Sequence, residues 1–229
     1  MQSKVLIGCP TYAGKRYCLD LYAAFLKNVD YQHFDILLVD TSPDGSYLSL
    51  LKEKGIPAIK GKQSEDVRNL LVENRNILRE KFLKGKYDFF FSLEQDVIPE
   101  PDALKRLLSH NKDIVAGIYL NTMRLKGKNV LLPLAFHEQK KFRGRLVPLK
   151  PEEIKSKKLL EIDACGLGCT LIKRKVLENI TFQHVGGFDD FGFCQAAKKA
   201  GFTIYADTAV RAKHYAKPWL KLEGDMWKQ

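Results

Sequence analysis

Short apolar runs alternate with helical patterns over the first 120 residues of the chain. The apolar runs are rich in β-branched and aromatic residues and predict strands at Lys4–Cys9, Phe34–Asp40, Ile56–Ile59, Tyr87–Leu93 and Ile114–Tyr119. Apolar positions at helical spacing predict helices that end at about Lys27, cover Tyr47–Lys54 and Val67–Phe82, and begin at Pro101. This alternation predicts an α/β fold with a mostly parallel central sheet and helices on both of its faces.

The pattern changes after Asn121. Residues 122–158 show weak patterning and several prolines and glycines, so we interpret them as an insertion and not as a second domain. Beyond the insertion we expect strands at Leu159–Ala164, Thr170–Ile172 and Thr203–Tyr205, and a helix over Asp190–Ala200 that ends at Gly201. The sequence therefore predicts one domain over residues 1–229, with an aromatic C-terminal tail from about residue 215.

Composition is that of a soluble globular protein, with 45% hydrophobic and 28% charged residues. No apolar run approaches the roughly 20 residues of a membrane span, and the first apolar run is too short for a signal peptide. The five cysteines are an odd number scattered through apolar contexts. They predict buried, reduced thiols in a cytoplasmic protein.

The positive charge is concentrated in the insertion. The whole chain carries a net charge of +11, and residues 122–158 hold 11 lysines and arginines against 3 acidic residues, a net +8. A solvated surface loop explains this charge, and so does an anionic partner: a lipid phosphate, a membrane headgroup layer or nucleic acid. Charge alone does not choose among these readings.

The strongest chemical signal follows the strand predicted at Tyr87–Leu93, which runs directly into Glu94 and Asp96. Acidic groups directly after a buried strand lie at its carboxyl end, where open α/β sheets bind their ligands. Two carboxylates one residue apart on an extended segment point the same way. They are suited to hold a divalent cation, which would in turn hold a diphosphate.

Further motifs accompany this one, in order along the chain: Arg75-Asn76 in a helix, the pair Asp189-Asp190 at a helix start, and His214 near the end. Together they resemble the inverting family-2-like glycosyltransferases with a GT-A fold. The resemblance runs from Lys4 to about Tyr215 and is strongest in SLEQDVIPEPDALKRLL and DDFGFCQAAKKAGFTIYADTAVRAKHY.

The resemblance implies a role for each matching residue. It implies that Asp190 is the catalytic base and that Mn²⁺ or Mg²⁺ is held by Asp96 and His214. It also implies nucleotide binding by Thr11, Asp40, Arg75 and Glu94, and a loop for the acceptor or donor sugar that includes Gly166, Gly168 and Asp189.

The resemblance thus implies a metal-dependent inverting glycosyltransferase that uses a UDP- or GDP-sugar. A lipid-phosphate or glycan acceptor, with the protein peripheral at an anionic membrane, would suit the basic insertion. Structural readings remain open: Asp40 as the start of a turn, the Asp189-Asp190 pair as a helix cap, and Arg75 or His214 as ordinary structural residues.

Three other functions stay open as alternatives. The first is a catalytically silent sugar-nucleotide-binding domain. The second is a basic nucleic-acid-binding protein, which the lack of a recognisable nucleic-acid-binding motif disfavours. The third is a nucleotidyltransferase, although residues 10–15, PTYAGK, make a poor glycine-rich phosphate loop.

Overall fold

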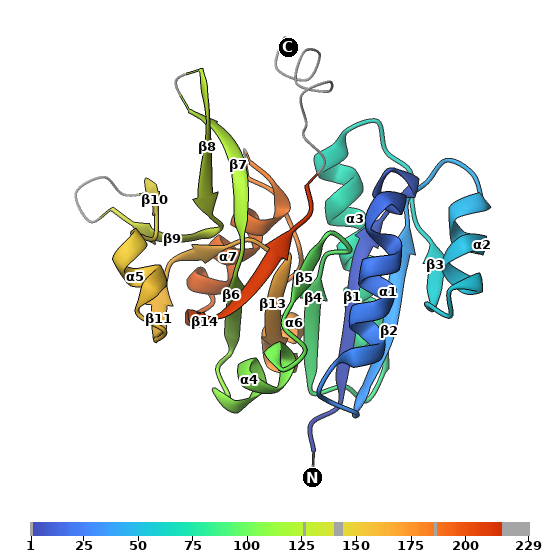
Figure 1. Ribbon diagram of the computed structural model, residues 1–229, viewed down its shortest axis with the longest axis horizontal. Helices are drawn as coiled ribbons and strands as arrows, with labels where there is room; N and C mark the ends of the chain where they lie inside the picture. The colour runs from blue at the N-terminus through green and yellow to red at the C-terminus, as the bar shows by residue number, and fades with distance from the viewer. Residues whose placement is uncertain (1, 126, 140–143, 186, 217–229) are drawn as a thin grey trace.

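The computed structural model describes residues 2–125, 127–139, 144–185 and 187–216. A nine-stranded sheet forms the centre of the molecule (Figure 1). Eight strands follow the order β11-β14-β6-β13-β4-β1-β2-β3, and β5 pairs with β14. Their bounds are β1 Val5–Thr11, β2 Phe34–Asp40, β3 Ala58–Lys60, β4 Phe89–Leu93, β5 Val97–Pro99, β6 Ile114–Ile118, β11 Leu159–Ile162, β13 Cys169–Lys173 and β14 Ile204–His214.

The prediction of a mostly parallel sheet is confirmed. Strands β3, β2, β1 and β4 run parallel to one another, and β6 runs parallel to β14. Strand β13 is inserted antiparallel between β4 and β6, and β11 pairs antiparallel with β14 at the edge. Strand β14 is much longer than the predicted Thr203–Tyr205 and continues to His214.

Helices cover both faces of the sheet. Buried side chains of α1 Leu19–Asn28, α2 Ser46–Glu53 and α4 Ala103–Ser109 pack in one apolar cluster with Phe91 of β4. Those of α3 Val67–Lys84, α6 Arg174–Asn179 and α7 Asp189–Lys199 pack in a second cluster with Phe90. Adjacent residues of β4 therefore enter opposite faces, as expected of a strand with an uninterrupted apolar run.

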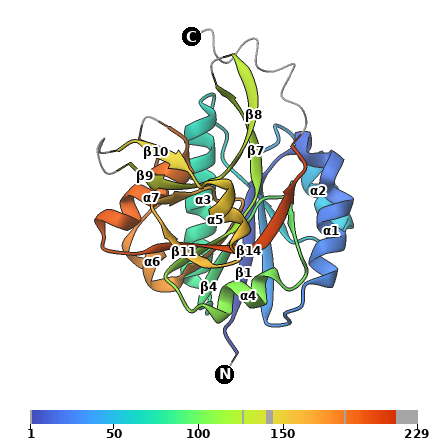
Figure 2. The ribbon, with the colours of Figure 1, turned by 60° about the vertical axis from the view of Figure 1, so that its left-hand side comes forward.

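The insertion is more regular than its weak patterning predicts. It forms a hairpin of β7 Leu120–Leu125 and β8 Lys128–Pro133, then β9 Ala135–Glu138, β10 Leu146–Pro148 and helix α5 Pro151–Lys155. Strands β9 and β10 join β12 Ala164–Cys165 in a second sheet, where Phe136 is buried. Figures 1 and 2 both show the hairpin rising beyond the body of the protein.

Three smaller expectations can be compared with the structure. A 3₁₀ helix, η1 Ala13–Cys18, follows β1 and includes part of the PTYAGK segment that makes a poor phosphate loop. All five cysteines are buried and free, as predicted. None of the helices in the described part of the chain is long and apolar enough to cross a membrane. Of the predicted aromatic tail, everything beyond Ala216 lies outside the described residues.

Candidate functional site

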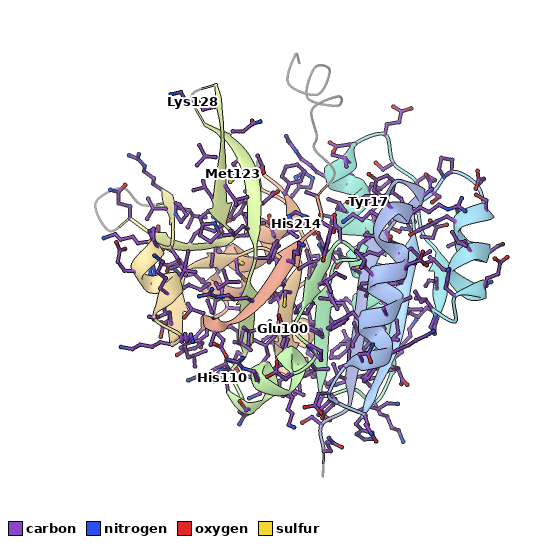
Figure 3. All side chains as sticks on the ribbon, viewed as in Figure 1. Tyr17, Glu100, His110, Met123, Lys128 and His214 are labelled. Atoms are coloured by element: carbon purple, nitrogen blue, oxygen red, sulfur yellow. The ribbon has the colours of Figure 1, made fainter. Side chains whose placement is uncertain are left out.

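The candidate site lies where β1, β4 and β14 end at one edge of the central sheet. Glu94 and Asp96 follow β4, η1 follows β1, and His214 is the last residue of β14. Figure 3 shows Tyr17 of η1 and His214 at this edge. Both approach Asp96: the Tyr17 hydroxyl lies 3.5 Å and His214 Nε2 lies 3.6 Å from its Oδ2. The structure thus brings together residues that are more than a hundred positions apart in the sequence.

Strand pairing positions His214. Strand β5 pairs antiparallel with the end of β14, which places Val97 opposite His214, and the Tyr215 amide donates to the Asp96 carbonyl at 2.7 Å. His214 Nδ1 lies 3.2 Å from the Leu120 carbonyl. This contact helps to hold the ring with Nε2 facing Asp96.

Asp96 is held as a carboxylate by its neighbours. Its side chain is 8% exposed, and Lys15 Nζ lies 2.6 Å from Oδ1. Burial by itself would raise the pKa of Asp96, but the hydrogen bond from His214 and the charge of Lys15 outweigh it and lower the pKa to about 2. The same lysine lies 3.6 Å from Glu94 Oε2, so both carboxylates of the predicted motif face one ammonium group.

Arg75 is buried and uses all three of its guanidinium nitrogens. Nε donates to Asp189, Nη1 to Ser92 Oγ at 3.0 Å and Nη2 to Glu94 at 2.8 Å. Burial would lower the pKa of Arg75, but the charges of Asp189 and Glu94 raise it above its usual value. The arginine implied to bind nucleotide therefore joins α3, the end of β4 and the start of α7.

Gln95 was missed by the sequence analysis. It is fully buried between the two acidic residues. Its Oε1 accepts from Thr11 at 2.5 Å and from the Tyr47 hydroxyl at 2.8 Å, and its Nε2 donates to the Lys15 carbonyl at 2.9 Å. The Thr11 hydroxyl, implied to bind nucleotide, is thus committed to fixing the loop that carries Glu94 and Asp96. The only signal in the sequence was the position of Gln95 between two acids.

Asp40 combines a turn with an unmet acceptor. Its Oδ1 accepts from the Ser42 amide at 2.9 Å and from the Ser42 hydroxyl at 2.5 Å, as the turn reading expects. Its Oδ2 is buried and accepts no hydrogen bond from the described residues, with Lys60 Nζ 3.6 Å away. Because a buried acceptor without a donor is costly, this oxygen is suited to a ligand N–H.

The acidic pair at the start of α7 divides into two environments. Asp189 is buried and bound to Arg75, whereas Asp190 is half-buried and its Oδ1 accepts from the Phe191 amide at 2.8 Å. Burial, followed by the charge of Asp189, raises the pKa of Asp190 to about 7. Asp190 can therefore exchange a proton near neutral pH.

The loop with Gly166 and Gly168 lies beside Glu94. The Glu94 amide donates to the Gly168 carbonyl at 3.0 Å, and the Gly168 amide donates to the Tyr119 hydroxyl at 3.0 Å. A side chain at either glycine would overlap the hydroxyl end of Tyr119. The glycines are therefore required for the close approach of Tyr119, which also packs edge-on against His214.

Asp96 and His214 are the residues at this edge that could hold a metal ion. No three histidine, cysteine, aspartate or glutamate side chains converge on a metal position within the described ranges. One carboxylate and one imidazole 3.6 Å apart nevertheless fit a divalent ion whose other ligands are water and substrate phosphate oxygens.

Comparisons with known proteins identify the fold. The sequence matches no family model and has no significant match among curated proteins. The structure is similar to that of A197 from STIV, with a TM-score of 0.54 and 20% identity, over 93% of this chain and 86% of that one. It is similar to GalNAc-T7, crystallised with UDP, GalNAc and Mn²⁺, with a TM-score of 0.68 and 13% identity, over 93% of this chain and 44% of that one.

A third similar structure is residues 1–349 of S. aureus TarS in complex with UDP-GlcNAc, with a TM-score of 0.56 and 15% identity, over 95% of this chain and 60% of that one. The chain has a GT-A fold. This chain spans less than two thirds of the GalNAc-T7 and TarS chains, and at these identities the likeness shows the GT-A fold alone.

Removing the buried guanidinium should destabilise the protein. We expect Arg75→Met to lower the free energy of unfolding by about 3 to 5 kcal/mol, because Asp189 would be left as an uncompensated buried charge. Urea denaturation measures the loss, with the exposed Arg68→Met on the same helix as the control. Adding Asp189→Leu to Arg75→Met should recover part of it, and a loss below about 1 kcal/mol would contradict the assignment.

The raised pKa of Asp190 makes a prediction about stability. Between its unfolded pKa of 3.8 and its folded pKa of about 7, the folded state binds more protons than the unfolded state. Stability should therefore fall as the pH rises through this window, by about 4 kcal/mol at most. Asp190→Asn removes this loss, so its stability advantage over the wild type in thermal melts should grow from pH 4 to pH 7 and stay constant above. An advantage independent of pH would refute the raised pKa.

Proposed function

We propose that the protein is a glycosyltransferase that takes its sugar from a nucleotide-sugar donor. The observation that carries this proposal is the division of labour among the carboxylates. Asp96 and Glu94 lie beside Lys15 at the sheet edge, and the pKa of Asp96 is lowered there, whereas burial raises the pKa of Asp190 on α7 to about 7. The similar structures GalNAc-T7 and TarS, crystallised with UDP and with UDP-GlcNAc, support the same class of donor.

Asp40 is the residue proposed to recognise the base of the nucleotide. Its buried Oδ2 lacks a donor among the described residues, and a base N–H would provide one. Uracil and guanine both carry a ring N–H suited to a carboxylate, so the donor is proposed to be a UDP- or GDP-sugar. Glu94, whose side chain is 27% exposed, is proposed to contact the ribose or the phosphates.

A divalent ion is part of the proposal. Asp96 and His214 would hold Mn²⁺ or Mg²⁺, which when bound would neutralise charge on the leaving diphosphate. Arg75 contributes indirectly, because it holds Glu94 in place.

Asp190 is the proposed catalytic base. The acceptor oxygen attacks the anomeric carbon while its proton passes to the Asp190 carboxylate. The bond between the anomeric carbon and the diphosphate breaks, and its electron pair leaves with the diphosphate. A single in-line displacement of this kind inverts the anomeric centre. The helix dipole in the first turn of α7 favours the ionised form of Asp190, but burial and the charge of Asp189 oppose it more strongly, so the pKa of this base is raised to about 7.

The hairpin β7–β8 is proposed to face the acceptor. The carbonyl of Leu120, the first residue of the hairpin, lies 3.2 Å from His214 Nδ1, so the base of the hairpin borders the site. Leu131 is 59% exposed, and Lys128 lies at the projecting end (Figure 3). Apolar and basic residues together suit an anionic membrane. We therefore propose a lipid-phosphate acceptor, with a soluble glycan as the alternative, for a cytoplasmic protein peripheral at the membrane.

Binding and transfer together test the function. We expect calorimetry to show UDP or GDP binding that strengthens with Mn²⁺ and weakens in Asp96→Ala. Asp190→Asn should keep nucleotide affinity within about twofold but lose about 10²- to 10⁴-fold in transfer rate. The wild-type rate should rise with pH with an apparent pKa near 7, since the base acts when ionised. Binding without transfer to any acceptor would favour a silent binding domain, and no nucleotide binding at all would refute the proposal.

Vesicle co-sedimentation tests the membrane contact. We expect binding to vesicles with anionic lipid but not to neutral vesicles, and a loss of binding at high salt. Leu131→Asp should reduce vesicle binding at least about tenfold, whereas Leu21→Asp, an equivalent change at an exposed leucine of α1, should not. Equal binding of both variants would contradict the hairpin assignment.

A further inference from the structure

Lys15 is a cation placed at the carboxylates that the resemblance assigns to a metal. Its Nζ lies 2.6 Å from Asp96 Oδ1 and 3.6 Å from Glu94 Oε2. Its side chain is 19% exposed, so it is screened from bulk water on most of its surface. An ammonium group within 4 Å of two carboxylates neutralises charge that a metal ion would otherwise neutralise.

The position of Lys15 is fixed by its backbone. The Lys15 amide donates to the Tyr12 carbonyl at 2.9 Å, and its carbonyl accepts from Gln95 Nε2 at 2.9 Å. Gln95 is the fully buried residue between the two acids. One buried amide thus ties the turn that carries the lysine to the loop that carries the carboxylates. These backbone bonds distinguish the Lys15–Asp96 ion pair from an isolated ion pair on the surface. The long lysine side chain can still move while its backbone stays fixed.

Building on the metal and donor sites proposed above, we propose that Lys15 competes with the divalent ion for Asp96 and is released by the donor diphosphate. In the free protein Lys15 is the counter-ion of the carboxylates and weakens metal binding by repulsion. The diphosphate offers the ammonium a new anionic partner, which frees Asp96 for the metal. Metal and donor binding then strengthen each other, and the coupling is reciprocal.

The direct test measures Mn²⁺ binding without nucleotide. The electron paramagnetic resonance signal of free Mn²⁺ reports binding in wild type, Lys15→Met and Lys15→Arg, none of which needs to turn over. We expect Lys15→Met to bind Mn²⁺ at least tenfold more tightly than wild type, and Lys15→Arg to stay weak because it keeps the charge. Lys52→Met, at an exposed lysine of α2, is the matched control and should not change.

The coupling is measured by repeating the Mn²⁺ titrations with saturating UDP, and with GDP. The nucleotide should raise the Mn²⁺ affinity of both proteins, and the factor by which it does so should be at least tenfold larger in wild type than in Lys15→Met. Nucleotide binding in the presence of a chelator should weaken in Lys15→Met, because the ammonium contact to the diphosphate is lost. Thermal melts of each variant show that the changes come from folded protein.

The outcomes separate this inference from the proposed function. Mn²⁺ affinity of Lys15→Met within twofold of wild type, or no Mn²⁺ binding in either protein, would overturn the competition even if the enzyme transfers sugar. Tighter Mn²⁺ binding in Lys15→Met would support the competition even if no nucleotide binds and the glycosyltransferase proposal fails.

Discussion

The arrangement of the site depends on the hydrogen bonds of one buried group, the Arg75 guanidinium. It lies in the interior, where an unpaired charge is costly, and it is satisfied only when Asp189, Ser92 and Glu94 surround it together. These residues come from the start of α7 and the end of β4, and Arg75 itself from α3. Glu94 and Asp189 are thereby fixed relative to one another, because the same cation binds both.

The central strands and the carboxylates could be predicted because their signals are local. The apolar run at Tyr87–Leu93 enters both apolar clusters, as the sequence indicated. Glu94 and Asp96 face the same way, as expected, but the group that they face is the Lys15 ammonium, which the sequence did not indicate. The full length of β14 could not be predicted, because polar residues and a shift in register between Asp207 and Arg211 interrupt its pattern. The predicted strand stopped at Tyr205, so the sequence did not show that the same strand continues to His214 and brings it to Asp96.

The partners of the site residues were also hidden from the sequence. Arg75 and Asp189 are 114 positions apart, and no local pattern links them. Gln95 and Lys15 are likewise joined across 80 positions by a bond to a backbone carbonyl. The residue types indicated which chemistry to look for, but the structure decides which groups support others and which remain available. Thr11 and Arg75 hold other residues of the site in place by their hydrogen bonds. Asp40 Oδ2, by contrast, lacks a donor among the described residues, and Asp190 is half-buried.

The place of β14 in the sheet has a consequence for synthesis of the chain. Strands β3, β2, β1 and β4 are neighbours and all lie within residues 5–93, so the half of the sheet proposed to bind the nucleotide can form while the chain is still growing. Strand β14 lies between β6 and β11 in the other half, and it is made last among the described strands. Asp189, Asp190 and His214 all arrive after the first half is in place. A nascent chain thus acquires the surface proposed to bind the donor before it has the proposed catalytic base Asp190 or the imidazole of His214. Arg75 has no carboxylate of α7 to bind until Asp189 has been made.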